Sequence, residues 1–254
     1  MRLGILDCDR LDPDLVGSFG PVYSEMFIKG FRALAPALEY RVWSALDGEL
    51  PSDLNECDAW LITGSRHDAY SDIPWILALR DWIRRAHDAN VKLAGICFGH
   101  QVIAQALGGE VVKSTKGWGL GVSVHPMQEA KPWMQPGLET IRILASHQDQ
   151  VAQLPPGATL LAGNDFCPNF MFLQGGSHSR HPGSSGVFGG VQPGADRAAA
   201  GSAARRALPE QPLLPGGRSG LGHHDAVVAA VPRHAAGRAC RALSVRLSYP
   251  PCRC

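Results

Sequence analysis

The stretch that most constrains the fold of this chain is residues 91–109, VKLAGICFGHQVIAQALGG, in which two glycines flank a cysteine. Its first part is a short apolar run typical of a buried strand, and its second part places apolar residues at helical spacing. The double glycine at 108 and 109 is typical of a helix C-terminus. Gly95 and Gly99 lie two residues either side of Cys97, and glycine lets neighbouring backbone approach where a Cβ atom would clash. We therefore predict a tight strand-to-helix turn centred on Cys97.

A cysteine in such a turn is expected to be a nucleophile. The turn raises its central side chain to solvent at the carboxyl end of the strand, as the serine nucleophile elbow does. The N-terminus of the following helix lies beneath it, and its positive dipole end favours thiolate over thiol. The alternative is a cysteine buried in a core strand, where most free cysteines lie. That alternative fits poorly with two flanking glycines and the polar pair His100-Gln101.

The residues around Cys97 resemble a known motif. GICFGHQ at 95–101 is similar to the pattern Gly-x-Cys-x-Gly-x-Gln of the class I glutamine amidotransferases. The resemblance is closest to the stand-alone members and the related γ-glutamyl peptidases, and it covers about residues 1–174. Three other segments carry it: LITGSRHDAYSDIPWI at 61–76, KGWGLGV at 116–122 and SHQDQV at 146–151.

The order of apolar patterns predicts an α/β fold. Short apolar runs alternate with segments of helical spacing, which specifies a doubly wound, mostly parallel sheet with helices on both faces and right-handed crossovers. The resemblance implies the same flavodoxin-like fold. We expect strands at 3–6, 40–43, 59–63 and 91–96 and helices at 24–34 and about 74–90. After Gly109 we expect an extra β-layer and the last strands of the sheet, at 110–114, 121–125, 140–145, 159–162 and 169–173.

The composition divides the chain at about residue 175. Residues 1–174 carry 14 Lys and Arg against 20 Asp and Glu, whereas residues 175–254 carry ten Arg, no Lys and three acids. Gly, Ala, Pro and Ser dominate the second part, which is typical of a disordered or poorly packed tail. We therefore predict an amidotransferase-like domain at 1–174 and a tail at 175–254.

The basic tail could indicate a nucleic-acid arm. It lacks the interleaved aromatic residues that stack on bases, so we expect no nucleic-acid partner. No apolar run reaches the length of a membrane span, and no secretory signal is visible at the N-terminus. The seven cysteines are an odd number without metal-type spacing before Cys252, so we expect a reducing cytosol and no metal.

Attack of Cys97 on an amide requires an oxyanion hole that binds the charge of the tetrahedral intermediate. The natural donors are the backbone N–H of Phe98, directly after the nucleophile, and one from the loop at Gly64-Ser65. The resemblance implies the same two places. An ordinary strand-to-helix turn is the alternative interpretation of Gly64-Ser65.

The resemblance also implies a substrate site. Gln101 matches the family glutamine that contacts the amino-acid part of the substrate, and Ser65, in the loop at Gly64-Ser65, is a further substrate-binding candidate. The segment Ser146–Asp149 matches the one that binds the α-amino and carboxylate groups largely through backbone, which makes His147 and Gln148 candidates. His147 as the general base is an alternative.

The base of the family's catalytic triad is not found. The resemblance implies a downstream Gly-His-Pro-Glu string after a strand, in which the histidine is the base and the glutamate orients it. His181-Pro182-Gly183 is the nearest string and lacks the carboxylate. His100 lies too close to Cys97 along the helix start to be that base, and we expect it to cap or pack.

The codons of residues 178–188 suggest why the Gly-His-Pro-Glu string is missing. With each serine written as TCN, a shift of one base lets ten consecutive codons encode Ile-Leu-Gly-Ile-Gln-Gly-His-Pro-Glu-Phe. This is the missing strand followed by the missing His and Glu. We therefore hypothesise that the tail from about Gly175 is an out-of-frame translation of a GC-rich gene.

These residues indicate amide chemistry on a γ-glutamyl group. By resemblance, Cys97 attacks the side-chain amide of glutamine, releases ammonia and leaves a γ-glutamyl thioester, without a cofactor. The ammonia would pass to an acceptor on a separate synthase. One alternative is a γ-glutamyl peptidase, and another is a non-catalytic protein, because the chain as written lacks the triad His and Glu. A flavodoxin-like nucleotide binder is disfavoured, since no Gly-rich phosphate loop follows the first strand.

Overall fold

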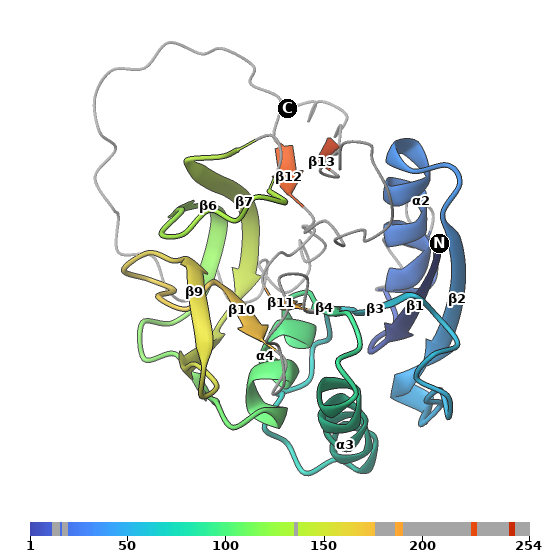
Figure 1. Ribbon diagram of the computed structural model, residues 1–254. Coiled ribbons are helices and arrows are strands. Elements are labelled where there is room, and N and C mark those ends of the chain that lie inside the picture. The colour runs from blue at the N-terminus through green and yellow to red at the C-terminus, as the bar shows by residue number, and fades with distance from the viewer. Residues whose placement is uncertain are drawn as a thin grey trace.

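The computed structural model describes residues 1–11, 16, 20–134 and 137–175, together with the backbone of three short strands farther along the chain. Its main sheet has seven strands in the order β2-β1-β3-β4-β11-β10-β9 (Figure 1). The strands β2, β1, β3, β4 and β11 pair in parallel, and β10 and β9 complete the sheet in antiparallel orientation. In chain order they are β1 Arg2–Asp7, β2 Glu39–Ser44, β3 Ala59–Ile62, β4 Leu93–Gly95, β9 Ala158–Ala162, β10 Met171–Gly175 and β11 Gly186–Gly189.

Helices lie on both faces of this sheet, as the sequence predicts. The helix α2 (Tyr23–Leu34) packs on the face that carries Ile5 and Leu61. The helices α3 (Pro74–Asp88) and α4 (Phe98–Ala106) pack on the opposite face. Successive strand residues point to opposite faces, so each buried strand supplies both cores. The fold is therefore the predicted doubly wound α/β arrangement.

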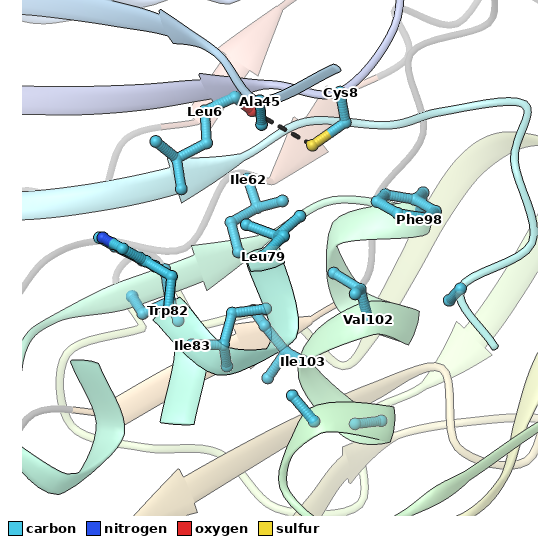
Figure 2. Close-up of a cluster of buried hydrophobic side chains, with 14 of the residues drawn as sticks. Leu6, Cys8, Ala45, Ile62, Leu79, Trp82, Ile83, Phe98, Val102 and Ile103 are labelled. Carbon is cyan, nitrogen blue, oxygen red and sulfur yellow. Dashed lines mark hydrogen bonds between the residues drawn. The ribbon is translucent and has the colours of Figure 1, made fainter. Parts of the chain in front are cut away.

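The core under α3 and α4 shows why these elements form. Proline stands at the start of α3, where its missing N–H costs no hydrogen bond. The apolar positions of α3 recur at helical spacing and are fully buried: Ile76, Leu79, Trp82, Ile83 and Ala86. Figure 2 shows Leu79 near Ile62 of β3 and Ile83 near Ile103 of α4, all within one buried cluster. The polar end of Trp82 is satisfied by the Pro51 carbonyl, to which Nε1 donates at 3.0 Å.

A separate β-layer follows α4. The strand β5 (Glu110–Lys113) pairs with β8 (Asp149–Gln153), and β6 (Gly119–Pro126) pairs with β7 (Thr140–His147), both in antiparallel orientation. The strand β8 was not predicted, because its residues include a single large apolar side chain, and pairing with β5 overrides that pattern. A short 3₁₀ turn, η1 (Ala45–Asp47), follows β2. Several predicted boundaries were wrong by two residues or more: β10 begins at residue 171 rather than 169, β6 begins at 119 rather than 121, β7 ends at 147 rather than 145, and β4 spans only three residues.

The strand β11 lies beyond the predicted end of the domain at residue 174. Its backbone pairs with β4 on one side and with β10 on the other, next to the strand that leads to Cys97. Two further strands, β12 (Asp225–Val227) and β13 (Ser244–Arg246), pair with each other. The prediction of a poorly packed tail otherwise falls on residues outside those described. Within the described part of the chain, no helix has both the length and the apolar character that crossing a membrane requires.

Candidate functional site

Cys97 lies in the sharp turn that the glycine spacing predicts. It follows β4 after one residue and precedes Phe98, the first residue of α4, with φ 52° and ψ −108°. A positive φ is uncommon for a residue with a Cβ atom and is tolerated where the surroundings hold it. Here the Gly99 N–H donates to the Thr63 carbonyl at 3.1 Å, which ties the turn to the end of β3. Cys97 is half-buried, whereas Cys8, Cys57 and Cys167 are buried.

The two glycines of the motif are required by close backbone contacts. A Cβ atom at Gly95 would lie 2.4 Å from the carbonyl carbon and oxygen of Gly99. A Cβ atom at Gly99 would lie 2.3 Å from the Ile62 carbonyl oxygen. Both distances are shorter than any contact a real Cβ atom makes, and the atoms that would be struck are backbone that cannot swing away. The motif is therefore a packing requirement of the turn.

A pocket of about 300 Å³ opens beside Cys97. It is lined by residues from the loops after β1 and β3, from α4, and from the turn between β7 and β8. The predicted substrate-site residues all line it: Ser65, Gln101, His147 and Gln148. The structure therefore brings these candidates to one place, although they are as many as 83 positions apart in the chain. Their roles there stay predictions.

Gln101 joins α4 to the turn between β7 and β8. Its Nε2 donates to the main-chain carbonyl of Asp149 at 2.8 Å, and its own N–H donates to the Cys97 carbonyl at 3.0 Å. Gln148 is held by a longer bond from its Nε2 to the Ser114 carbonyl, at 3.4 Å. Gln101 is thus held beside Cys97 by hydrogen bonds from both its side chain and its backbone.

The two candidate oxyanion donors lie next to Cys97. A Cβ atom built on Gly64 would stand 3.8 Å from the Cβ of Cys97, which places the loop after β3 in contact distance of Cys97. The N–H of Phe98 belongs to the first turn of α4, where N–H groups have no helical acceptor. The Phe98 side chain is fully buried, so only its backbone faces the turn. Their function as oxyanion donors stays a prediction.

Three histidines lie near Cys97, and they differ in burial and in the groups that they contact. His100 is buried against the Phe172 ring, with ring centroids 4.9 Å apart, and burial lowers the pKa of its imidazole to about 3. It therefore packs in the core. His67 lies within hydrogen-bond distance of Ser65, with 3.0 Å between Nδ1 and Oγ. His147 is half-buried, its Nδ1 lies 3.2 Å from the Asp149 carbonyl oxygen, and burial lowers the pKa of its ring.

Comparison with known proteins identifies the family. Residues 22–178 match the family described as glutamine amidotransferase class-I. The chain belongs to the class I glutamine amidotransferase family. It is 41% identical over 145 residues to γ-glutamyl peptidase 4 of Arabidopsis thaliana, a match that covers 51% of this chain and 58% of that protein. The match thus spans less than two thirds of the peptidase.

Two further similarities are more distant. Over 154 residues, 59% of this chain and 65% of the other, it is 28% identical to a glutamine amidotransferase-like protein of Penicillium rubens. A glutamine amidotransferase from Thermotoga maritima superposes with a TM-score of 0.59 at 19% identity over 74% of each chain. This structural similarity shows that the fold is shared.

The class I amidotransferase domain also has acidic pocket residues that the sequence interpretation missed. Asp68 and Asp149 both line the pocket beside Cys97. Burial, together with the neighbouring Asp68 carboxylate, raises the pKa of Asp149 above its ordinary value. The available signal was that Asp68 lies in the loop after β3 and Asp149 at the turn between β7 and β8, because functional side chains are disproportionately found on such connecting segments.

The sequence of this amidotransferase domain contains no Gly-His-Pro-Glu string. The nearest string, at residues 181–183, falls outside the residues that the structure describes. Among the described residues, no group of three or more His, Cys, Asp or Glu side chains is arranged to hold a metal ion.

Proposed function

We propose that the protein cleaves the γ-amide bond of a γ-glutamyl compound with Cys97 as the nucleophile. The Cys97 sulfur attacks the γ-carbonyl carbon, a C–S bond forms and the C–N bond breaks. The thiol proton leaves with the nitrogen, as ammonia or as an amine. Water then attacks the γ-glutamyl thioester, which releases glutamate and restores the thiol.

The observation that carries this proposal is the geometry of Cys97. It stands in a turn with positive φ above the first N–H groups of α4, half-buried beside a pocket of about 300 Å³. A helix N-terminus favours the thiolate, and N–H groups close to the sulfur can bind the oxyanion of the tetrahedral intermediate. A buried structural cysteine needs neither feature. Membership of the family supports the same assignment.

The proposed chemistry does not by itself specify the leaving group. Glutamine would release ammonia, which an acceptor on a separate synthase would consume, whereas a γ-glutamyl peptide would release an amino compound. The similarity to γ-glutamyl peptidase 4 favours the peptide, and that similarity spans 58% of the peptidase. The pocket is also lined by Arg10 and Arg66, which pair with Asp47 and Asp9, and its volume leaves room for a leaving group larger than ammonia. We therefore assign γ-glutamyl peptides as the preferred substrate and glutamine as the second.

A non-catalytic function is the second candidate. The observation that favours it is the lack of a Gly-His-Pro-Glu string in the sequence. Loss of one member of a catalytic triad lowers turnover by several orders of magnitude while binding persists. Such a protein would bind a γ-glutamyl compound and would acylate slowly or not at all.

Two measurements on the full chain test these alternatives. The first is covalent labelling with a glutamine analogue that carries a diazoketone in place of the side-chain amide, read by peptide mass spectrometry, with Cys97→Ala as the control. Labelling confined to Cys97 supports the proposed nucleophile, and no labelling of Cys97 rejects it. The second compares glutamate release from γ-glutamyl dipeptides and from glutamine. Labelling without release of glutamate from either substrate would establish the non-catalytic alternative.

A further inference from the structure

We infer that His147 is the base that accepts the proton of Cys97, a position that the family's downstream histidine would otherwise fill. This inference rests on the proposed function of Cys97. His147 ends β7, and Cys97 begins the turn into α4. Both residues line the pocket of about 300 Å³, and both also line a smaller cavity of about 30 Å³. His147 and Cys97 therefore border the same two cavities from two different elements.

The hydrogen bond of His147 determines which of its nitrogens can accept a proton. Its Nδ1 lies 3.2 Å from the main-chain carbonyl oxygen of Asp149. A carbonyl oxygen only accepts hydrogen bonds, so this contact requires the proton on Nδ1 and leaves the lone pair on Nε2. In a Ser-His-Asp triad a carboxylate selects the same tautomer. Here a backbone carbonyl replaces the carboxylate as the group that orients the ring.

The other two histidines near Cys97, His100 and His67, pack against other residues. His100 packs on Phe172 and is 6% exposed, so a proton there would be buried without compensation. His67 lies against the Ser65 hydroxyl and packs on the edge of Trp75. Of these three, His147 alone lines both cavities, and the partner of its Nδ1 is a carbonyl oxygen, which can only accept.

The surroundings of His147 keep its ring neutral before reaction. Burial lowers its pKa, and the bond to the Asp149 carbonyl opposes that effect in part. His100 from α4 and His125 from β6 interact electrostatically with it, and Phe166 contacts it edge-on. The Asp149 carboxyl belongs to the same turn, and burial and Asp68 raise its pKa. A neutral imidazole at pH 7 can accept a proton, which an imidazolium cannot.

Each proton in the proposed step has a donor and an acceptor. The S–H bond of Cys97 breaks, its proton moves to Nε2 of His147, and the thiolate attacks the γ-carbonyl carbon of the substrate. When the C–N bond breaks, the leaving nitrogen takes the proton back from Nε2. In the second half, a water molecule gives a proton to Nε2 while its oxygen attacks the thioester, and the released Cys97 thiolate recovers that proton.

The test measures the alkylation rate of Cys97 by iodoacetamide, a small neutral probe, between pH 5 and 10, with each cysteine followed by peptide mass spectrometry. In the wild-type chain we expect an apparent pKa below the ordinary thiol value of about 8.5. In His147→Gln we expect the profile to move toward that value and the rate at pH 7 to fall about tenfold or more. The matched control is His67→Gln, which removes another histidine from the same pocket and should leave the profile in place.

A second variant guards against a folding defect. In His147→Ala, added imidazole can enter the space left by the ring and should accelerate alkylation of Cys97, whereas it should not do so in the wild type. A purely structural role of His147 would not produce this rescue. An unchanged profile in His147→Gln, or His147→Ala that melts normally and ignores imidazole, would overturn the inference. Because labelling of wild-type Cys97 by the diazoketone analogue is read separately, failure of the base and failure of the nucleophile are distinguishable.

Discussion

The main-chain carbonyl of Asp149 accepts a hydrogen bond from the Gln101 side chain, with 2.8 Å between Nε2 and O. The same carbonyl lies 3.2 Å from Nδ1 of His147. A carbonyl oxygen has two lone pairs and can satisfy both donors. Gln101 on α4 therefore holds the carbonyl that contacts His147, and the helix that follows Cys97 is joined to the turn between β7 and β8.

The first prediction concerns this bond. In Gln101→Glu the donor is replaced by an ionised oxygen that faces the Asp149 carbonyl. We expect the free energy of unfolding to fall by about 1–3 kcal/mol, because a charged acceptor is buried without its donor. We also expect slower alkylation of Cys97 at pH 7. Denaturant unfolding and the iodoacetamide assay measure the two effects. Gln128→Glu makes the same chemical change at an exposed position and should change neither quantity.

The second prediction concerns the turn itself. Gly99→Ala introduces a Cβ atom 2.3 Å from the Ile62 carbonyl oxygen, so either α4 or the end of β3 must move. We expect a loss of about 2 kcal/mol or more in the free energy of unfolding and a large loss of Cys97 labelling by the diazoketone analogue. The control is Gly137→Ala, where the added Cβ would meet no atom within 4 Å. Equal stability of the two variants would mean that the turn is looser than these contacts require.

The third prediction concerns pH and the buried carboxyl of Asp7, which ends β1. Its oxygens accept the Ser24 N–H at the start of α2, at 3.1 and 3.3 Å, but burial dominates and raises its pKa to about 6 from 3.8. Between these two values the folded chain keeps a proton that the unfolded chain releases. Asp7 therefore lowers stability as pH rises through this window.

Asp7→Asn removes that titration while keeping an oxygen that can accept from Ser24. Relative to the wild type, the variant should gain up to about 3 kcal/mol in free energy of unfolding between pH 4 and pH 7. Urea titrations of both proteins at the two pH values give this difference directly. A variant that loses stability relative to the wild type on going to pH 7 would contradict the predicted sign.

The fourth prediction concerns the gene. If the tail from about Gly175 is translated out of frame, the DNA across codons 170–190 should contain a one-base insertion or deletion. Restoring the frame should create Gly-His-Pro-Glu after a strand and should increase release of glutamate. Resequencing this region decides the matter, and an unbroken reading frame would end the hypothesis. Because His147 is tested in the chain as written, that result does not depend on the outcome.

The local turn around Cys97 and the class of fold could be predicted from the sequence, because both depend on neighbours in the chain. The spacing of Gly95, Cys97 and Gly99 determines which atoms collide in the turn, and helical spacing determined the buried face of α3. The family motif indicated Gln101 and the segment at 146–149, and these residues line one pocket in the structure, whereas their roles there stay predictions.

Only the tertiary structure decided what meets Cys97 across the pocket. Asp68, Gln101 and His147 come from three elements, and their meeting depends on the strand order and on the path that brings the end of β7 beside α4. The pairing of β8 with β5, and the position of β11 between β4 and β10, were likewise invisible, because neither strand has an apolar pattern that stands out. Periodicity in the sequence indicates which face of a helix or strand is buried. Contacts between distant segments determine what packs on that face, and they also place the carbonyl that contacts His147.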